Sequence, residues 1–161
     1  MGTYFLDQYS LLHFVSGILC RHLNISFTFL FIFHIIFEYI ENSKQGMYVI
    51  NNYFKVWPGG KPNADTFINS VSDIILSLFG WLVMDIFIKN GINYIGTDIA
   101  LGVLLYFWIY PTNGMILSTL LLLIIYKLYK SNLIYGFLFA LLLDYLGLHY
   151  RLYEPHTKSN L

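Results

Sequence analysis

The fold of this chain is decided by the stretch Asn69-Ser-Val-Ser-Asp73-Ile-Ile-Leu-Ser77-Leu-Phe-Gly80-Trp-Leu-Val-Met-Asp85-Ile-Phe-Ile-Lys89. It is long and apolar enough for one membrane-spanning helix, which needs about 20 such residues to cross the hydrocarbon core. On a helix, its polar and small residues share one stripe, which consists of Asn69, Asp73, Ser77 and Gly80. Because small side chains let another helix approach closely, the stretch predicts a membrane helix whose polar stripe faces helical neighbours.

The composition of the chain is that of an integral membrane protein. Of its 161 residues, 57% are apolar and only 11% are charged, and the mean hydropathy is +0.61. These values lie outside the range of soluble domains. Nine basic and nine acidic residues cancel, so no long-range field attracts nucleic acid, and we expect no nucleic-acid partner. We expect a single domain over residues 1–161, in a multi-pass protein of a cell or inner membrane with membrane lipid as its partner.

Six apolar runs predict membrane helices, because every backbone polar group in hydrocarbon must be satisfied within its own segment. The runs cover residues 8–22, 25–40, 69–89, 92–110, 115–129 and 133–150. The first two are short and closely spaced, which favours a tight helical hairpin, so five crossing helices compete with six. The predicted fold class is therefore all-α, a polytopic transmembrane helical bundle of five or six helices. Basic residues divide five to four between the two sides and leave the orientation open.

The one long connection, residues 41–66, is also patterned. Met47, Ile50, Phe54 and Trp57 fall on one face of a helix. Aromatic residues with polar edges suit the head-group level of a bilayer. The pattern predicts a short interfacial helix in the long loop, ended by Pro58.

Ionisable residues inside the apolar runs also fall on helix faces. His34, Glu38 and Glu41 are spaced i, i+4 and i+7, so they share a narrow stripe along about 10 Å of the helix axis. Ser10 and His13 begin a similar stripe on the first helix. Each stripe can therefore present several polar groups to one neighbour.

Chain direction brings these stripes to one side of the membrane. If the first helix starts on that side, the second ends there, the long loop lies there and the third begins there. We therefore expect a shared depth, with His34 one turn deeper, for His13, Glu38, Glu41, Asn69 and Asp73. Asp85 and Asp98 fall in the opposite halves of their helices, so we leave them out of this cluster.

Taken singly, these residues have structural explanations. A lone His in an apolar helix is more often a packing residue than a ligand, Glu41 could mark a helix exit, and Asn69 could cap a helix start. A charge at membrane depth, however, costs about 2.5–3.5 kcal/mol on insertion scales, so a cluster of charges is a functional-site hypothesis. We therefore expect one shared polar site.

Two chemistries fit this site. The candidate catalytic residues are His13, His34, Glu38, Glu41 and Asp73. The candidate ligand-binding residues are Asp7, Ser10, Asp65, Asn69 and Ser70. An imidazole beside a carboxylate can exchange a proton with a lipid head group or pass protons onward. A divalent metal is the minor hypothesis: these side chains suit zinc, manganese or iron, but the spacings His-Glu-x-x-His and Glu-x-x-His are missing. The cofactor is therefore left open, as is whether the protein is an enzyme.

Three segments carry a resemblance to a known family. They are Tyr9-Ser-Leu-Leu-His13, Phe37-Glu38-Tyr-Ile-Glu41-Asn42 and Ala64-Asp65-Thr66-Phe-Ile-Asn69-Ser70-Val-Ser-Asp73. They resemble the Tyr-Thr-x-x-His, Trp-Glu-x-x-Glu-Asn and Gly-Asp-Ser-x-x-Asn-Ser-x-x-Asp segments of an uncharacterised family of bacterial inner-membrane proteins, catalogued as a domain of unknown function. A looser similarity links the chain to VanZ-like membrane proteins. The departures, Phe37 for Trp, Ala64 for Gly and Thr66 for Ser, spare the ionisable groups.

The resemblance covers residues 7–80, about half of the chain, and Asp7 also looks like a matching acid. It implies that the family's polar centre consists of His13, Glu38, Glu41, Asp65, Asn69 and Asp73. It also implies that the helices over residues 92–150 are particular to this protein. The resemblance supplies no reaction.

Three functions are compatible with such a site. The leading hypothesis is a membrane protein that binds or processes a lipid-derived or amphiphilic ligand. The second is a proton or ion pathway, which requires polar groups continuing toward Asp98 and Asp85. The third is a structural assembly subunit, in which every polar atom is satisfied by protein.

Overall fold

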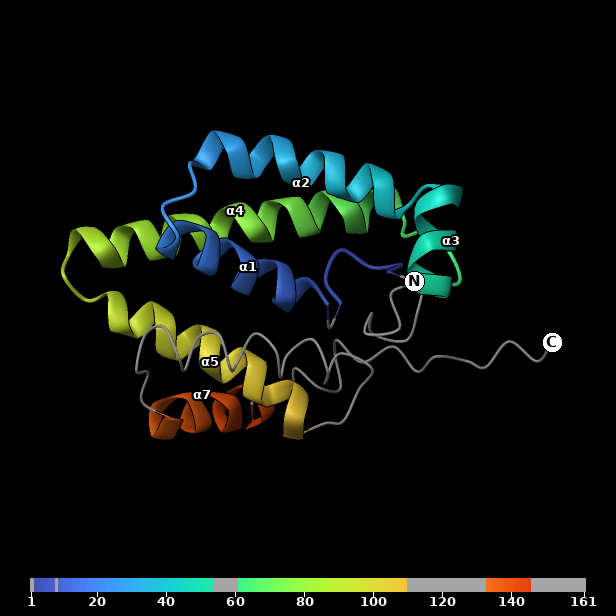
Figure 1. The fold of residues 1–161 in the computed structure, drawn as a ribbon. Helices are drawn as coiled ribbons and strands as arrows, with labels where there is room; N and C mark the ends of the chain where they lie inside the picture. Colours follow the sequence, from blue (N-terminus) through green and yellow to red (C-terminus); the bar gives the residue numbers. More distant parts are fainter. Residues whose placement is uncertain (1, 8, 54–60, 110–132, 146–161) are drawn as a thin grey trace.

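The computed structural model describes residues 2–7, 9–53, 61–109 and 133–145, and the regular secondary structure in those ranges is helical. Its helices, shown in Figure 1, are α1 (Ser10–His22), α2 (Phe27–Glu41), α3 (Lys44–Tyr53), α4 (Phe67–Lys89), α5 (Asn93–Ile109) and α7 (Leu133–Tyr145). The predicted all-α class is confirmed for this part of the chain. The predicted run 115–129 lies outside the described residues, as do Phe54, Trp57 and Pro58 of the predicted loop helix.

Side-chain caps start two of the helices at the places where the apolar runs begin. Ser26 accepts a hydrogen bond from the Phe29 backbone N–H (3.2 Å), and Thr66 accepts one from the Asn69 N–H (3.4 Å). Such caps satisfy N–H groups that the first turn of a helix leaves free. The two caps therefore fix the residues at which α2 and α4 begin.

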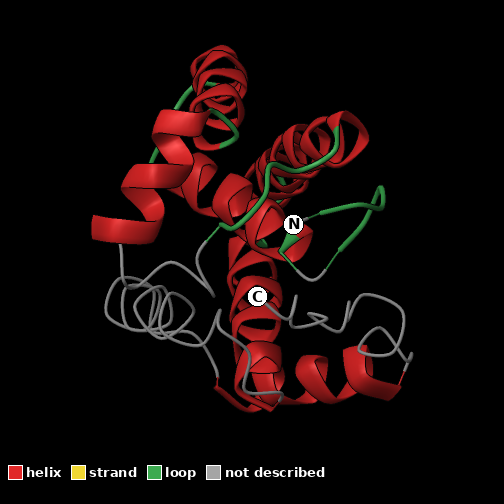
Figure 2. Cartoon of the chain, turned by 90° about the vertical axis from the view of Figure 1, so that its right-hand side faces the viewer, coloured by secondary structure: helices red, strands yellow, loops and turns green. Residues whose placement is uncertain are grey.

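Helix α4 is the central element of the fold. It packs most extensively against α1, while α2 lies along another side of α4, and α5 and α7 form a second pair (Figure 1). Figure 2 shows the same helices and their connecting loops from a side turned by 90°. Gly17 of α1 lies against the backbone carbonyl of Ser77, and Gly80 of α4 lies against that of Phe14. A Cβ at either glycine would overlap the facing backbone, so both glycines are needed for the close approach of α1 and α4.

Apolar side chains fill the space between α1, α4 and α5. The fully buried members include Val15, Ile18, Met84 and Leu104. This apolar core occupies the end of α4 that lies away from its polar start. The remaining sides of the bundle follow a different pattern.

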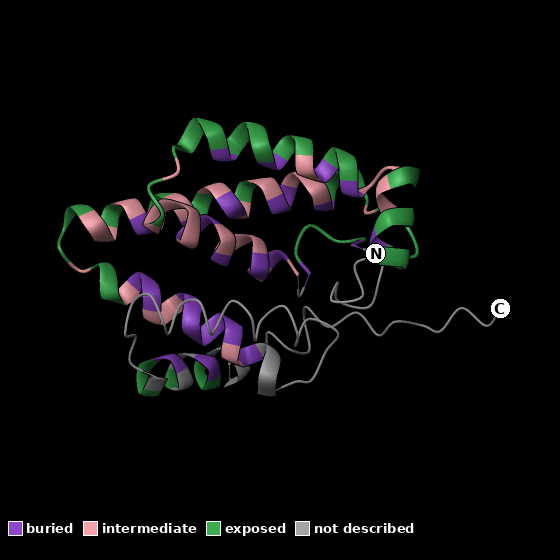
Figure 3. Ribbon diagram, in the orientation of Figure 1, coloured by how far each residue is buried: buried purple, intermediate pink, exposed green. Residues whose placement is uncertain are grey.

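Burial on α2 and α4 is inverted relative to a water-soluble helix. Figure 3 shows a buried stripe along α2, which consists of Leu30, His34, Glu38 and Glu41. The residues between them are large and apolar and are exposed, for example Ile32 at 53% and Phe33 at 52%. Among the described helices, α4 alone is long and apolar enough to cross a membrane; its 23 residues extend about 34 Å. Helices α1 and α2, with 13 and 15 residues, are shorter than the roughly 20 residues that one crossing needs. The predicted polytopic bundle of five or six helices is therefore not confirmed by the described helices.

Candidate functional site

The site begins with Asp7, which precedes α1. Its Oδ1 atom accepts hydrogen bonds from the backbone N–H groups of Tyr9 (2.8 Å) and Ser10 (3.0 Å). Burial raises the pKa of this carboxyl, although these N–H donors oppose the shift. Asp7, a predicted ligand-binding residue, therefore stabilises the first turn of α1. In that position Ser10 donates from Oγ to Asp73 Oδ1 on α4 (2.6 Å).

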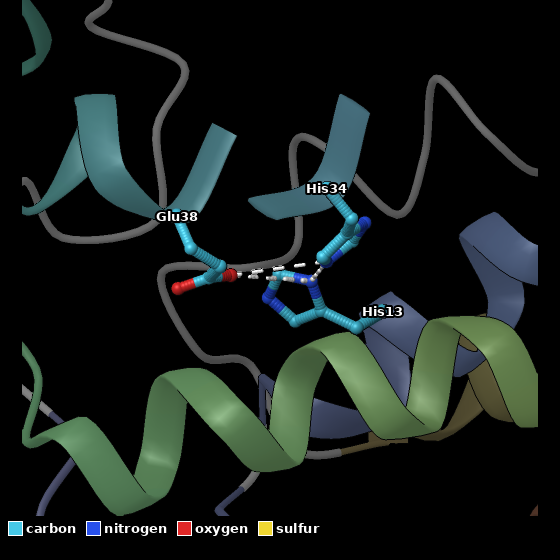
Figure 4. Close-up of side chains that lie close together, drawn as sticks. All are labelled: His13, His34 and Glu38. Atoms are coloured by element: carbon cyan, nitrogen blue, oxygen red, sulfur yellow. Dashed lines mark hydrogen bonds and ion pairs between the residues drawn. The ribbon is translucent and has the colours of Figure 1, made fainter. Parts of the chain in front are cut away.

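Two histidines and one glutamate face one another at the centre of the site (Figure 4). The distance from His13 Nδ1 on α1 to His34 Nε2 on α2 is 2.8 Å. Glu38 Oε1, one turn along α2, lies 3.9 Å from that His13 atom and 3.8 Å from that His34 atom. The three predicted residues thus converge through single atoms, and they come from two helices.

His13 also faces the central helix. Its Nε2 atom lies 3.7 Å from Asp73 Oδ2, so the imidazole stands between Asp73 on one side and His34 on the other. The His13 side chain is 16% exposed, whereas those of His34 and Glu38 are 6% and 4% exposed. His13 is therefore the member of this group that a ligand can reach.

A second cluster lies beside the first and is held by a lysine. The Lys61 ammonium donates to Glu41 Oε1 and to Asp65 Oδ2, and Lys61 is only 3% exposed. Asn51 of α3 fixes the Lys61 backbone through hydrogen bonds to its N–H (2.6 Å) and its carbonyl (2.9 Å). The segment that precedes α4 thus places a cation against two carboxylates.

The charges in this cluster shift one another. Burial lowers the pKa of Lys61, but the Glu41 and Asp65 carboxylates outweigh it and raise that pKa above its ordinary value. Burial likewise raises the pKa of Asp65, but Lys61 and the Gly2 N–H, which donates to Asp65 Oδ1 (2.6 Å), bring it below its ordinary value. The lysine and Asp65 are therefore both charged at neutral pH.

Two asparagines join the clusters. Asn42 accepts from the Asp65 N–H (2.7 Å) and donates to Ser70 Oγ (3.2 Å) and Glu38 Oε2 (3.3 Å). Asn69, which is 1% exposed, donates to the Tyr4 carbonyl (3.0 Å). Asn69 and Ser70, both predicted as ligand-binding, therefore lie in the polar network and hold its segments together.

The structure separates Asp85 from this site, as the sequence predicts. Asp85 pairs with Arg21 (2.8 Å) and Lys89 (2.6 Å). It lies twelve residues after Asp73 on the same helix, a distance of about 18 Å. Asp73 and Asp85 therefore lie in opposite halves of α4.

All ten predicted site residues contribute to this polar network, while sequence reasoning missed the importance of Lys61. Lys61 lies outside the helices, so no helical stripe marks it, and the signal that the sequence offers is an acidic residue, Asp65, four positions later. Among the described residues, two groups have the composition and spacing to hold a cation: His13, His34 and Glu38, or Glu38, Glu41 and Asp65. Lys61 already supplies the positive charge to the second group.

No protein-family model, curated protein or solved structure matches this chain. The resemblance to the uncharacterised inner-membrane family and to VanZ-like proteins therefore stays a prediction.

Proposed function

We propose that this chain is a multi-pass integral membrane protein that binds a lipid-derived or amphiphilic ligand at the site around His13. The inverted burial of α2 and α4 is the observation that carries this proposal. On α4, Asp73 is 3% exposed whereas Phe79 and Ile86 are 53% and 56% exposed. In water such an arrangement loses the free energy of apolar burial, but in lipid it places apolar groups outward and polar groups inward.

The surface beside the histidines supports an amphiphilic ligand. Phe29, Phe33 and Phe37 stack in succession along α2, with ring centroids 6.1 and 6.4 Å apart. The last ring lies 6.4 Å from the His13 ring and 5.8 Å from the His34 ring. In the proposal, the acyl chain lies along these three rings and the polar head reaches His13.

The helix next to the proposed head-group position also has features of a membrane surface. Helix α3 packs against α2, the helix whose last residue is Glu41. Its exposed face carries Tyr48 and Tyr53, at 60% and 71% exposure, and tyrosines are enriched at the head-group level. The proposed ligand therefore has its polar end near the head groups and its chain deeper in the bilayer.

The residues around His13 could also act on a bound head group. An imidazole that faces Asp73 on one side and His34 on the other can accept or donate a proton, and a carboxylate partner orients its ring. In the proposal, His13 exchanges the proton, Asp73 orients it, and His34, Glu38 and Glu41 complete the polar surroundings.

Two observations favour this function over the alternatives. Along the buried stripe of α4, Asp73 and Ser77 are followed by Gly80 and Met84, so within the described residues the polar groups do not continue toward Asp85 as a proton pathway requires. Glu38 Oε1 is buried with no hydrogen-bond partner among the described residues. A purely structural role is expected to satisfy such an atom, because an unpaired buried acceptor is costly.

The test is to identify what the full chain retains. Membrane fractions are washed with alkaline carbonate, and the protein is then purified in mild detergent and analysed by native mass spectrometry. We expect the wild type to resist extraction and to carry a lipid-class molecule. Glu38→Gln and Asp73→Asn should lose it while keeping the wild-type circular dichroism spectrum, and Asp85→Asn is the matched control. Release of the wild type by carbonate, or equal retention in all variants, contradicts the proposal.

A further inference from the structure

The nitrogen and oxygen atoms that meet in Figure 4 have the spacing of metal ligands. The three distances among His13 Nδ1, His34 Nε2 and Glu38 Oε1 are 2.8, 3.8 and 3.9 Å. For a triangle of these sides, the point equidistant from its corners lies about 2.1 Å from each atom. Zinc binds His nitrogen at about 2.0–2.1 Å and carboxylate oxygen at about 2.0–2.2 Å. One ion at this point is therefore within bonding distance of all three atoms, and small shifts of the side chains, which widen the 2.8 Å separation of the two nitrogens, give it the tetrahedral arrangement that zinc prefers.

From this geometry we propose that His13, His34 and Glu38 form a binding site for one divalent transition-metal ion, with Zn²⁺ as the preferred ion. Two imidazoles and one carboxylate are a ligand set that zinc uses in catalytic sites, where a fourth position stays open. The proposal rests on the proposed function only in one respect: the fourth position is where the head group of an amphiphile would bind. With the ion in place, His13 serves as a ligand and no longer exchanges a proton with the head group.

A second observation points to the same ion. Glu38 Oε1 is buried, has no hydrogen-bond partner among the described residues, and is directed at the two imidazole nitrogens. The other oxygen of this carboxylate is held by Asn42 (3.3 Å). Without an ion, at most one proton lies between the facing nitrogens, and the lone pair on Glu38 Oε1 stays unused. An ion accepts all three lone pairs at once.

The surroundings of His13 are suited to a ligand role. Metal-bound imidazoles usually donate their second N–H toward a carboxylate, which fixes the tautomer and the ring orientation. When Nδ1 binds the ion, Nε2 carries the proton, and Nε2 faces Asp73 Oδ2 at 3.7 Å. Asp73 is itself held by Ser10 through a 2.6 Å hydrogen bond. In the proposal Asp73 is a positioning residue for the ligand His13: the 3.7 Å separation is about 0.5 Å too long for a hydrogen bond, and it shortens when the ion binds.

The neighbouring carboxylates do not compete for this ion. Glu41 Oε1 and Asp65 Oδ2 both accept hydrogen bonds from the Lys61 ammonium. An ion placed there would have to displace a buried lysine, which costs the ion pair and leaves an ammonium without a partner. The structure therefore favours the histidine group over the Glu38, Glu41 and Asp65 group.

The test measures metal binding in the full chain without added ligand. Protein purified in detergent is stripped with a chelator, incubated with Zn²⁺ and desalted, and bound metal is counted by plasma mass spectrometry. We expect about one Zn²⁺ per chain. Glu38→Gln, which keeps the shape of the side chain, should abolish stoichiometric binding. Asp73→Asn should weaken binding about 10–100-fold, the usual effect of losing a carboxylate beside a ligating His.

Asp85→Asn is the matched control, because it removes a carboxylate from α4 that pairs with Arg21 and Lys89 and lies outside both clusters of the site. It should retain the wild-type stoichiometry. Co²⁺ provides a second readout that a misfolded variant cannot imitate: His34→Cys should keep one Co²⁺ and add a thiolate-to-metal absorption band. A wild type that binds no Zn²⁺, an Asp85→Asn loss equal to that of Glu38→Gln, or a Co²⁺-loaded His34→Cys without the new band each overturns the proposal.

Metal binding and lipid retention fail independently. A chain that retains its lipid but takes up no Zn²⁺ refutes the metal site alone. A chain that takes up one Zn²⁺ but carries no lipid refutes the proposed function alone.

Discussion

Replacing Lys61 by Met tests the electrostatic account of the site most directly. Met keeps much of the length and apolar volume of the lysine stem but removes the ammonium. Lys61 is 3% exposed and binds Glu41 and Asp65, whose side chains are 7% and 8% exposed. Glu41 Oε2 has no hydrogen-bond partner among the described residues. The substitution therefore leaves Glu41 in a buried position without a cation.

The expected loss of stability is the free energy that the folded chain needs to neutralise the buried Glu41 carboxylate. The simplest response is for Glu41 to take up a proton. At pH 7, protonating a Glu of ordinary pKa about 4.3 costs about 3.7 kcal/mol, at 1.36 kcal/mol per pH unit. This lies within the range of about 3–5 kcal/mol typical of breaking a buried ion pair. At pH 5 the same step costs about 1 kcal/mol, so most of the loss of stability should vanish in acid.

The assay is reversible unfolding in mixed detergent, followed by circular dichroism at pH 7 and pH 5. Lys89→Met is the matched control, because Lys89 also pairs with an Asp at i, i+4 spacing but its side chain is 71% exposed. We expect a far smaller effect for Lys89→Met, since solvent screens that pair. The reasoning is refuted if the two variants lose equal stability at pH 7, or if the Lys61→Met loss is the same at both pH values.

Two further predictions concern helix packing and pH. Gly80→Val should destabilise the fold by about 1–3 kcal/mol through overpacking, because a Cβ there overlaps the Phe14 carbonyl. The control is Leu82→Val, because Leu82 lies on the same helix but is 45% exposed. Thermal unfolding compares the two variants, and equal effects would contradict a close contact between α1 and α4. The lowered pKa of Asp65 predicts stability that is present above its ordinary pKa of 3.8 and is lost as the pH falls through the lower folded value. The raised pKa of Lys61 predicts stability that is complete below its ordinary pKa of 10.5 and is lost as the pH rises through the higher folded value. A plot of Tm against pH should show both limbs, and Asp65→Asn should flatten the acid limb, which an unchanged acid limb would disprove.

Local pattern alone predicted the helices and their polar faces. The runs 8–22, 25–40 and 69–89 overlap α1, α2 and α4 to within two residues at each end, because helix starts, apolar runs and the 3.6-residue repeat are all local properties. The i, i+4, i+7 spacing likewise placed His34, Glu38 and Glu41 on one face, and that face is buried. Chain direction was enough to bring these residues to the level of His13 and Asp73.

Only the tertiary structure decided which atoms meet. The sequence placed His13 and His34 a turn apart in depth, and it is the close contact of α1 with α4, next to α2, that brings their nitrogens to 2.8 Å. No pattern in the sequence marks Lys61 as buried, whereas the fold places it between two carboxylates. Spacing along a helix fixes which face a side chain occupies, but distances between segments depend on how closely the backbones approach, and here that approach is set by Gly17 and Gly80.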